Sequence, residues 1–209
     1  MKIKLASLFA ITGLALAATQ VQADSLVDGS IEDGKAKSLT CSACHGPEGN
    51  SVSPMWPNIA GQNAPYLLTQ LKAFKDGSRT DPLMSAQAMM LSDQDMADLA
   101  VYFESLPAAA QSVKDASTVS RGETLYRGGN TESGVSACLA CHGPTGRGNP
   151  AAKYPALQGQ HADYTAKQLN DYASGARVSD GKTRIMRDIA ERLSKEDIAA
   201  LSSYVQGLK

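Results

Sequence analysis

Long hydrophobic runs are lacking in this sequence of 209 residues. The apolar stretch near its start, residues 5–18, is shorter than the roughly 20 residues that a helix needs to cross a bilayer, which argues against a membrane-spanning protein. No segment alternates apolar and polar residues over a sustained length, so the sequence favours an all-α fold over a β-sheet. Nor does any acid, base or nucleophile stand out as it would in the active site of an enzyme.

Cysteine and histidine are scarce too, with four and three residues respectively, yet they are not scattered. All four cysteines and two of the histidines fall in two copies of Cys-x-x-Cys-His, at residues 41–45 and 138–142. This is the attachment signature of c-type haem, because two thiols can add across the vinyl groups of one porphyrin while the adjacent imidazole reaches the iron. We therefore predict two covalently bound haem c groups, each with two cysteines and one histidine ligand: Cys41, Cys44 and His45, then Cys138, Cys141 and His142.

Two other uses of these cysteines are less well supported. Structural disulfides require neither a histidine after each Cys-x-x-Cys nor two copies of the same pattern. A structural zinc site takes four ligands, and each Cys-Cys-His cluster would lack one of them. Haem attachment explains both the spacing and its repetition.

The first residues have the pattern of an export signal. Lys2 and Lys4 form a basic start, the apolar run follows, and small residues up to Ala23 suit a signal peptidase. We predict a signal peptide over residues 1–23, cleavage near Ala23 and a periplasmic mature protein. A retained membrane anchor is the alternative, whereas a lipid anchor is disfavoured because no cysteine closely follows the apolar run.

The chain is an internal duplication. After each pentapeptide come a glycine-containing turn, an aromatic-proline pair and a Gly-Gln pair, and the matching residues lie 97 or 98 positions apart. Further on the offset becomes 102, so the second copy holds four extra residues. Self-similarity of this kind indicates two homologous domains in tandem. We predict an N-terminal domain over residues 24–106, a linker over 107–117 and a C-terminal domain over 118–209.

Helical periodicity and capping patterns predict three helices in each domain. An N-cap pattern starts the last helix at Ser92, and it recurs at Ser194. The middle helix of the first domain is expected to stop near Gly77, where a left-handed C-cap is easy. The leading and middle helices are expected near residues 34–39 and 65–74, and near 120–126 and 162–174.

The duplication also selects a second ligand for each iron. Met186 is the only methionine of the second half, and it stands eight residues ahead of Ser194, as Met84 stands ahead of Ser92. A methionine opposite a histidine closes the iron and suits electron transfer. We therefore predict Met84 and Met186 as ligands, each in a loop before the last helix. Met89 and Met90 have no counterpart and are expected to pack against the haem or the last helix, although any methionine can also be core filler.

His161 competes with Met186 for the second iron. Its counterpart in the first copy is Asn63, so a ligand role would be confined to one domain. We therefore interpret His161 as a surface histidine.

Other repeated residues are candidates for contacts around the haem. The carbonyls of Pro57 and Pro155, which follow the two motifs, could fix the histidine rings, or the prolines could simply form turns. Two further pairs are candidates for contacts with haem propionates: Arg79 with Arg177, and Tyr66 with Tyr164. The arginines could instead lie at the solvated surface, and the tyrosines could instead pack in the core.

These motifs together make the chain resemble the dihaem cytochromes c4, and each half resembles a class I cytochrome c domain. The resemblance covers nearly all of the mature chain and includes the Gly-Gln-x-x-x-Tyr-x-x-x-Gln-Leu stretches. It implies two domains that face each other about a pseudo-twofold axis, with haem propionates meeting between them. It also implies a periplasmic electron carrier, peripherally associated with the membrane, between a cytochrome bc1-type donor and a terminal oxidase, with no role for nucleic acid.

Charge is divided unequally between the two halves. Residues 24–112 carry 11 acidic and 5 basic side chains, a net charge of −6, whereas residues 113–209 carry 10 acidic and 13 basic ones, a net charge of +3. Such a dipole could orient a carrier at its partners, or it could be an ordinary solvated surface. The sequence thus predicts an electron-transfer protein of a respiratory chain rather than an enzyme. The alternatives are a dihaem peroxidase, a cytochrome subunit of an oxidoreductase, or a haem-based sensor, and each would need an open iron.

Overall fold

The computed structural model describes residues 26–209, and the predicted signal peptide lies outside them. Within this range the regular structure is helical, and the only β pairing consists of two isolated bridges. The α-helices are, in order, α1 (Ile31–Lys37), α2 (Leu39–His45), α3 (Ala64–Asp76), α4 (Pro82–Met89), α5 (Asp93–Ser105), α6 (Val119–Gly128), α7 (Leu139–His142), α8 (Ala162–Ala173), α9 (Ile185–Ala190) and α10 (Lys195–Gln206).

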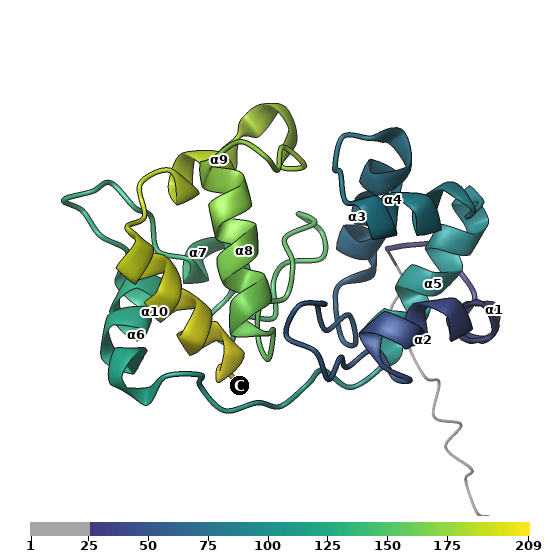
Figure 1. Ribbon diagram of the computed structural model, residues 1–209, viewed down its shortest axis with the longest axis horizontal. Coiled ribbons are helices and arrows are strands. Elements are labelled where there is room, and N and C mark those ends of the chain that lie inside the picture. Colours follow the sequence, from purple (N-terminus) through teal and green to yellow (C-terminus); the bar gives the residue numbers. More distant parts are fainter. Residues whose placement is uncertain (1–25) are drawn as a thin grey trace, which may run out of the picture.

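Figure 1 shows the helices gathered into two units, α1–α5 and α6–α10, joined by one extended segment. In the first unit α5 packs against α1 and α3, and α3 also contacts α4. In the second unit α10 packs against α6 and α8, and α8 contacts α9. The same set of neighbours therefore occurs twice, which confirms the predicted all-α fold of two tandem domains.

A glycine sets the close crossing of the first and last helices in each unit. A Cβ atom built on Gly34 of α1 would lie 2.1 Å from the carbonyl oxygen of Asp98 and 2.6 Å from Cβ of Tyr102, both on α5. A Cβ atom on Gly122 of α6 would meet the backbone of α10 in the same way, 2.5 Å from the carbonyl oxygen of Ala200. No side chain larger than hydrogen fits at either crossing without moving a helix.

Local signals place most of the helix ends. Ser92 and Ser194 each form a capping box, in which the serine hydroxyl accepts the N–H of a residue three positions later. Gly77 ends α3 with φ of 81°, the left-handed conformation that glycine adopts without strain. The leading element of the first domain is longer than expected, because α1 is followed at once by α2, which carries the first haem motif.

The predicted loop position of the two methionines is wrong, because Met84 and Met186 both lie in short helices, α4 and α9. The side chain of Asp81 accepts the N–H groups of Leu83 and Met84, and Pro82 occupies the first turn, where it leaves no helix hydrogen bond unmade. This cap starts α4 where a loop was expected.

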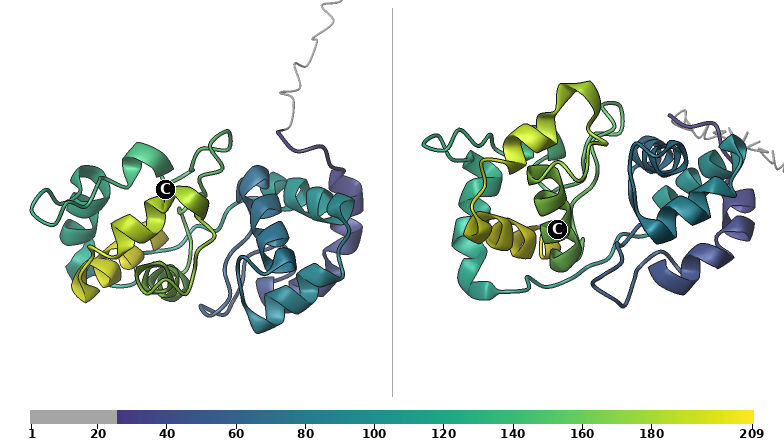
Figure 2. Two further views of the ribbon diagram at one scale, coloured as in Figure 1. Left: turned by 90° about the horizontal axis from the view of Figure 1, so that it is seen from above. Right: turned by 45° about the horizontal axis from the view of Figure 1, so that its top comes forward.

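The segment between the domains is bound along both of them. The side chain of Asn50 donates to the carbonyl of Pro107 at 3.2 Å, and that of Gln206 donates to the carbonyl of Ser112 at 2.8 Å. Between them, Gln111 donates its side-chain amide to the carbonyl of Gly159 at 2.8 Å. Figure 2 shows this segment running from one unit to the other beside their junction.

Candidate haem sites

The two motif histidines are buried at the ends of α2 and α7 and are held in the same way. Nδ1 of His45 lies 2.8 Å from the carbonyl oxygen of Pro57, and Nδ1 of His142 lies 2.9 Å from that of Pro155. A carbonyl can only accept, so Nδ1 carries the proton and Nε2 is left with a free lone pair. Burial lowers the pKa of both imidazoles, against the smaller opposite effect of the proline carbonyls. Each ring is therefore neutral and held in one orientation, with Nε2 free to bind a metal, and the proline carbonyls fix the histidine rings as predicted.

The four cysteines are free and half-buried. Burial raises the pKa of Cys41, and it raises the pKa of Cys138 to about 11. These two thiols are therefore protonated at neutral pH. In the first motif α2 places both cysteines about one turn apart and ahead of the histidine, and in the second motif Cys138 is the N-cap of α7, which contains Cys141 and His142.

The methionines are separated by burial as well as by position. Met84 and Met186 are half-buried, and each lies in the helix that precedes the last helix of its domain. Met89 and Met90 are 69% and 85% exposed, so their expected packing against the last helix is wrong, whereas their packing against the haem stays a prediction.

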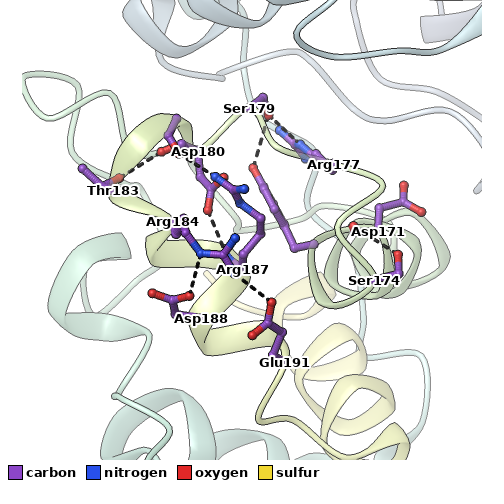
Figure 3. Close-up of polar contacts among 12 residues, drawn as sticks. Asp171, Ser174, Arg177, Ser179, Asp180, Thr183, Arg184, Arg187, Asp188 and Glu191 are labelled. Carbon is purple, nitrogen blue, oxygen red and sulfur yellow. Dashed lines mark hydrogen bonds and ion pairs between the residues drawn. The ribbon is translucent and has the colours of Figure 1, made fainter.

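A buried ion pair fixes the segment that carries Met186, which contains the four extra residues of the second copy. The Asp180 carboxylate accepts the backbone N–H of Arg187 at 3.0 Å and its Nε at 2.7 Å, as Figure 3 shows. Arg184, which precedes α9, has φ of 52°, an unusual conformation for a residue other than glycine. Asp180 thus anchors α9 next to Met186, much as Asp81 anchors α4 at Met84.

The junction of the domains has twofold symmetry at the level of single hydrogen bonds. Gln62 donates its amide to the carbonyl of Ala156 at 2.9 Å and accepts the N–H of the same residue at 2.8 Å. Gln160 does the same with Asn58, at 2.8 Å and 2.9 Å. Gln62 and Gln160 are equivalent in the two copies, and so are Asn58 and Ala156, which lie 98 residues apart. The domains therefore face each other through the same surface of the duplicated unit.

Two buried arginines extend this symmetric junction. Arg79 donates to Gln70 of its own domain at 2.9 Å and to Tyr164 of the other at 2.9 Å. Arg177, 5% exposed, donates to Tyr66 of the first domain at 2.9 Å. Both arginines also donate to a glutamine across the junction, at 2.8 Å and 2.9 Å. Solvated surface positions for the arginines are thereby excluded.

The charge of this pair is not balanced by the protein. Among residues 26–209 neither Arg79 nor Arg177 lies within ion-pair distance of a carboxylate; their hydrogen-bond partners are neutral side chains. Burial alone would raise the pKa of the Tyr66 hydroxyl, but the two guanidinium groups outweigh it and lower that pKa. Two buried cations without a carboxylate are costly unless an anion is bound beside them. The two arginines, the cysteine thiols and the free Nε2 atoms of the histidines together fit a haem in each domain with its propionates at the junction.

His161 is not a surface residue, and that interpretation is wrong. It is 8% exposed, and its Nε2 lies 2.9 Å from the carbonyl oxygen of Ser51 in the other domain. Its counterpart Asn63 also reaches across, donating to the carbonyl of Tyr154 at 2.8 Å. A polar residue at this position in both copies is the sequence signal for a shared role, but the sequence does not indicate which residues of the other domain His161 and Asn63 contact. Bonded in this way, His161 joins the domains.

Comparison with known proteins gives consistent results. The cytochrome c family model matches twice, at residues 31–107 and 119–209. Cytochrome c4 of Pseudomonas aeruginosa is 48% identical over 198 residues, which is 95% of this chain and 93% of the relative, and cytochrome c4 of Azotobacter vinelandii is 47% identical over 207 residues, with the same coverage. The crystal structure of reduced recombinant cytochrome c4 from Pseudomonas stutzeri superimposes with a TM-score of 0.84 at 46% identity, covering 87% of this chain and 100% of that one.

Proposed function

The chain belongs to the cytochrome c4 family of dihaem electron-transfer proteins, which are not enzymes, and from that premise we propose that it carries electrons in the periplasm from a cytochrome bc1-type donor to a terminal oxidase. The export signal predicted over residues 1–23 supports the compartment. Within residues 26–209 no helix is long and apolar enough to cross a membrane. Contact with membrane-bound partners would accordingly be peripheral for this part of the chain.

In the proposed sites each motif supplies three of the four protein attachments to one haem. Two cysteines would hold the porphyrin by thioether bonds, and the histidine would ligate the iron through the Nε2 atom that the proline carbonyl leaves free. When bound, the haem iron supplies a one-electron redox couple. The protein's contribution is to keep the ligands fixed, so that little reorganises on electron transfer. The half-buried methionines of α4 and α9 would be the second ligands, Met84 in the first domain and Met186 in the second.

The buried arginine pair is the observation that carries the proposal of two cooperating haems. Arg79 and Arg177 each bridge the two domains, and their unbalanced charge would be met by propionates from both sides. A cation pair at that position would bring the two haem edges to the same junction. An electron entering at one domain could then leave from the other without a large movement of the protein.

A dihaem peroxidase, the alternative of a different class, would need one iron without a second protein ligand. The equivalent placement of Met84 and Met186 disfavours a peroxidase, because each domain provides a methionine from the equivalent helix, α4 or α9. The two readings also differ in reactivity, since a closed iron does not bind carbon monoxide readily at neutral pH.

The test is the far-red absorption band that a methionine sulfur gives to a ferric haem. We expect the oxidised holoprotein to show this band, and Met84→Ala and Met186→Ala each to lose about half of it. Met55→Ala is the matched control, because Met55 is 70% exposed and outside the candidate sites. A high-spin ferric spectrum of the unaltered protein, or a band that keeps its full intensity in either variant, would contradict the ligand assignment. Oxidation of the reduced holoprotein by membranes that contain a terminal oxidase then tests the proposed acceptor.

A further inference from the structure

The outer face of α4 is mostly apolar and carries no charge. With 3.6 residues per turn, one side of the helix presents Ala88, which is fully buried, and half-buried Met84. Leu83, Met89 and Met90 are 61%, 69% and 85% exposed. The complete exposed face consists of Pro82, Leu83, Ala86, Gln87, Met89 and Met90, which we call the α4 face.

The second copy of the same helix provides an internal comparison. At the offset of 102 residues, Glu191 and Arg192 stand where the α4 face has Met89 and Met90. Arg184 pairs with the carboxylates of Asp188 at 3.2 Å and Glu191 at 3.1 Å. Figure 3 shows these side chains covering the outside of α9 with ion pairs. A helix that carries a methionine at this position therefore does not need an apolar outer face, and folding alone does not explain the α4 face.

Exposed methionine and leucine on one helix face are typical of a protein-binding surface. Methionine is enriched at the centre of interfaces and adapts its shape to a partner. The half of the chain that contains α4 has a net charge of −6, so it would attract a positively charged surface. An anionic lipid surface would be repelled, and the α4 face has no lysine or arginine with which to bind it.

We propose that the α4 face is the docking surface for the protein's redox partner, a protein whose contact surface has an apolar centre and a positively charged surround. This inference rests on the proposed function and adds to it the place of contact. Met84 lies on the inner side of the same helix, so a partner seated on α4 would be one helix away from it. The charged outer face of α9 would keep the same partner off the second domain.

The test gives the α4 face the two residues that stand at the equivalent positions of the second copy, Glu191 and Arg192. The variant M89E/M90R gains one charge of each sign, so the net charge of the protein does not change. The control L26R/I31E makes the same kind of change at two other exposed apolar positions of the first domain, 62% and 53% exposed. Oxidation of the reduced holoprotein by oxidase-containing membranes is measured as oxygen uptake against protein concentration. The ferric spectrum checks that both haem sites are intact.

We expect KM to rise about 10-fold or more in M89E/M90R, because residues at the centre of an interface contribute most of the binding energy. The kcat of M89E/M90R, and both KM and kcat of the control variant, should not change. An unchanged KM, or an equal rise in KM for both variants, would refute the α4 face as the docking surface while leaving the proposed function in place. Failure of the unaltered protein to be oxidised would instead overturn the proposed acceptor, and the docking surface with it. Co-flotation of the unaltered protein, but not of M89E/M90R, with phosphatidylglycerol–phosphatidylethanolamine vesicles would show a lipid-binding face and overturn the protein partner.

Discussion

Replacing Gln160 by alanine should loosen the junction between the two domains. Its side chain exchanges two hydrogen bonds with the backbone of Asn58 in the other domain, at 2.8 Å and 2.9 Å. Gln160 and Asn58 are 9% and 7% exposed, so water has little access to the groups that alanine would leave unpaired. The substitution removes no haem attachment and changes no charge.

The magnitude follows from these two bonds. A hydrogen bond contributes about 1 kcal/mol net, and a buried polar group left without a partner costs about 1–3 kcal/mol. Loss of the pair should therefore weaken the junction by about 2–4 kcal/mol. For a chain of this size each kcal/mol of stability corresponds to about 2–4 °C in the unfolding midpoint. Gln62→Ala should cost the same amount, because Gln62 makes the equivalent pair of bonds with Ala156.

Calorimetry of the holoprotein is the appropriate assay. We expect the unaltered protein to unfold in one transition, and Gln160→Ala to unfold at a lower temperature in two, as the domains lose their coupling. Gln87→Ala serves as the control, since Gln87 is exposed on α4 and away from the junction. A Gln160→Ala variant with a single transition at the original midpoint would show that these bonds do not hold the domains together. Unequal effects of Gln62→Ala and Gln160→Ala would refute the symmetric junction.

Three further outcomes follow from the packing and charge. Gly34→Ala should destabilise the protein by about 1–3 kcal/mol because its Cβ meets the backbone of α5, whereas Gly128→Ala, with open space around it, should be neutral or stabilising in denaturant unfolding. Lys37 is the main cause of the lowered pKa of Asp98, so this ion pair stabilises the fold above the ordinary carboxyl pKa of 3.8 and is lost as pH falls further; the stability lost by Lys37→Met should thus vanish in strong acid. Arg177→Leu removes a buried positive charge that favours the ferrous state, and a redox titration should show one midpoint lowered by about 60 mV, or about 1.4 kcal/mol.

The sequence predicted the tandem all-α fold because the signals for it are local. The cap at Ser92 and the stop at Gly77 depend on residues within one turn, and the structure has both. The carbonyl of Pro57 also meets His45 as its position after the motif suggested. The loop expected at Met84 is wrong because Asp81 caps α4, and this signal too is local.

What the sequence by itself determined is the covalent chemistry and its repetition. The two Cys-x-x-Cys-His motifs specify haem attachment through neighbouring atoms, and their spacing reveals the duplication. Only the tertiary structure decided how the repeated residues are used. Burial of Arg177 and His161 at the junction depends on residues more than 100 positions away, as does the identity of their partners. The apolar face of α4 likewise became visible only when folding had buried the other side of the helix, since exposure is a property of packing and not of residue type.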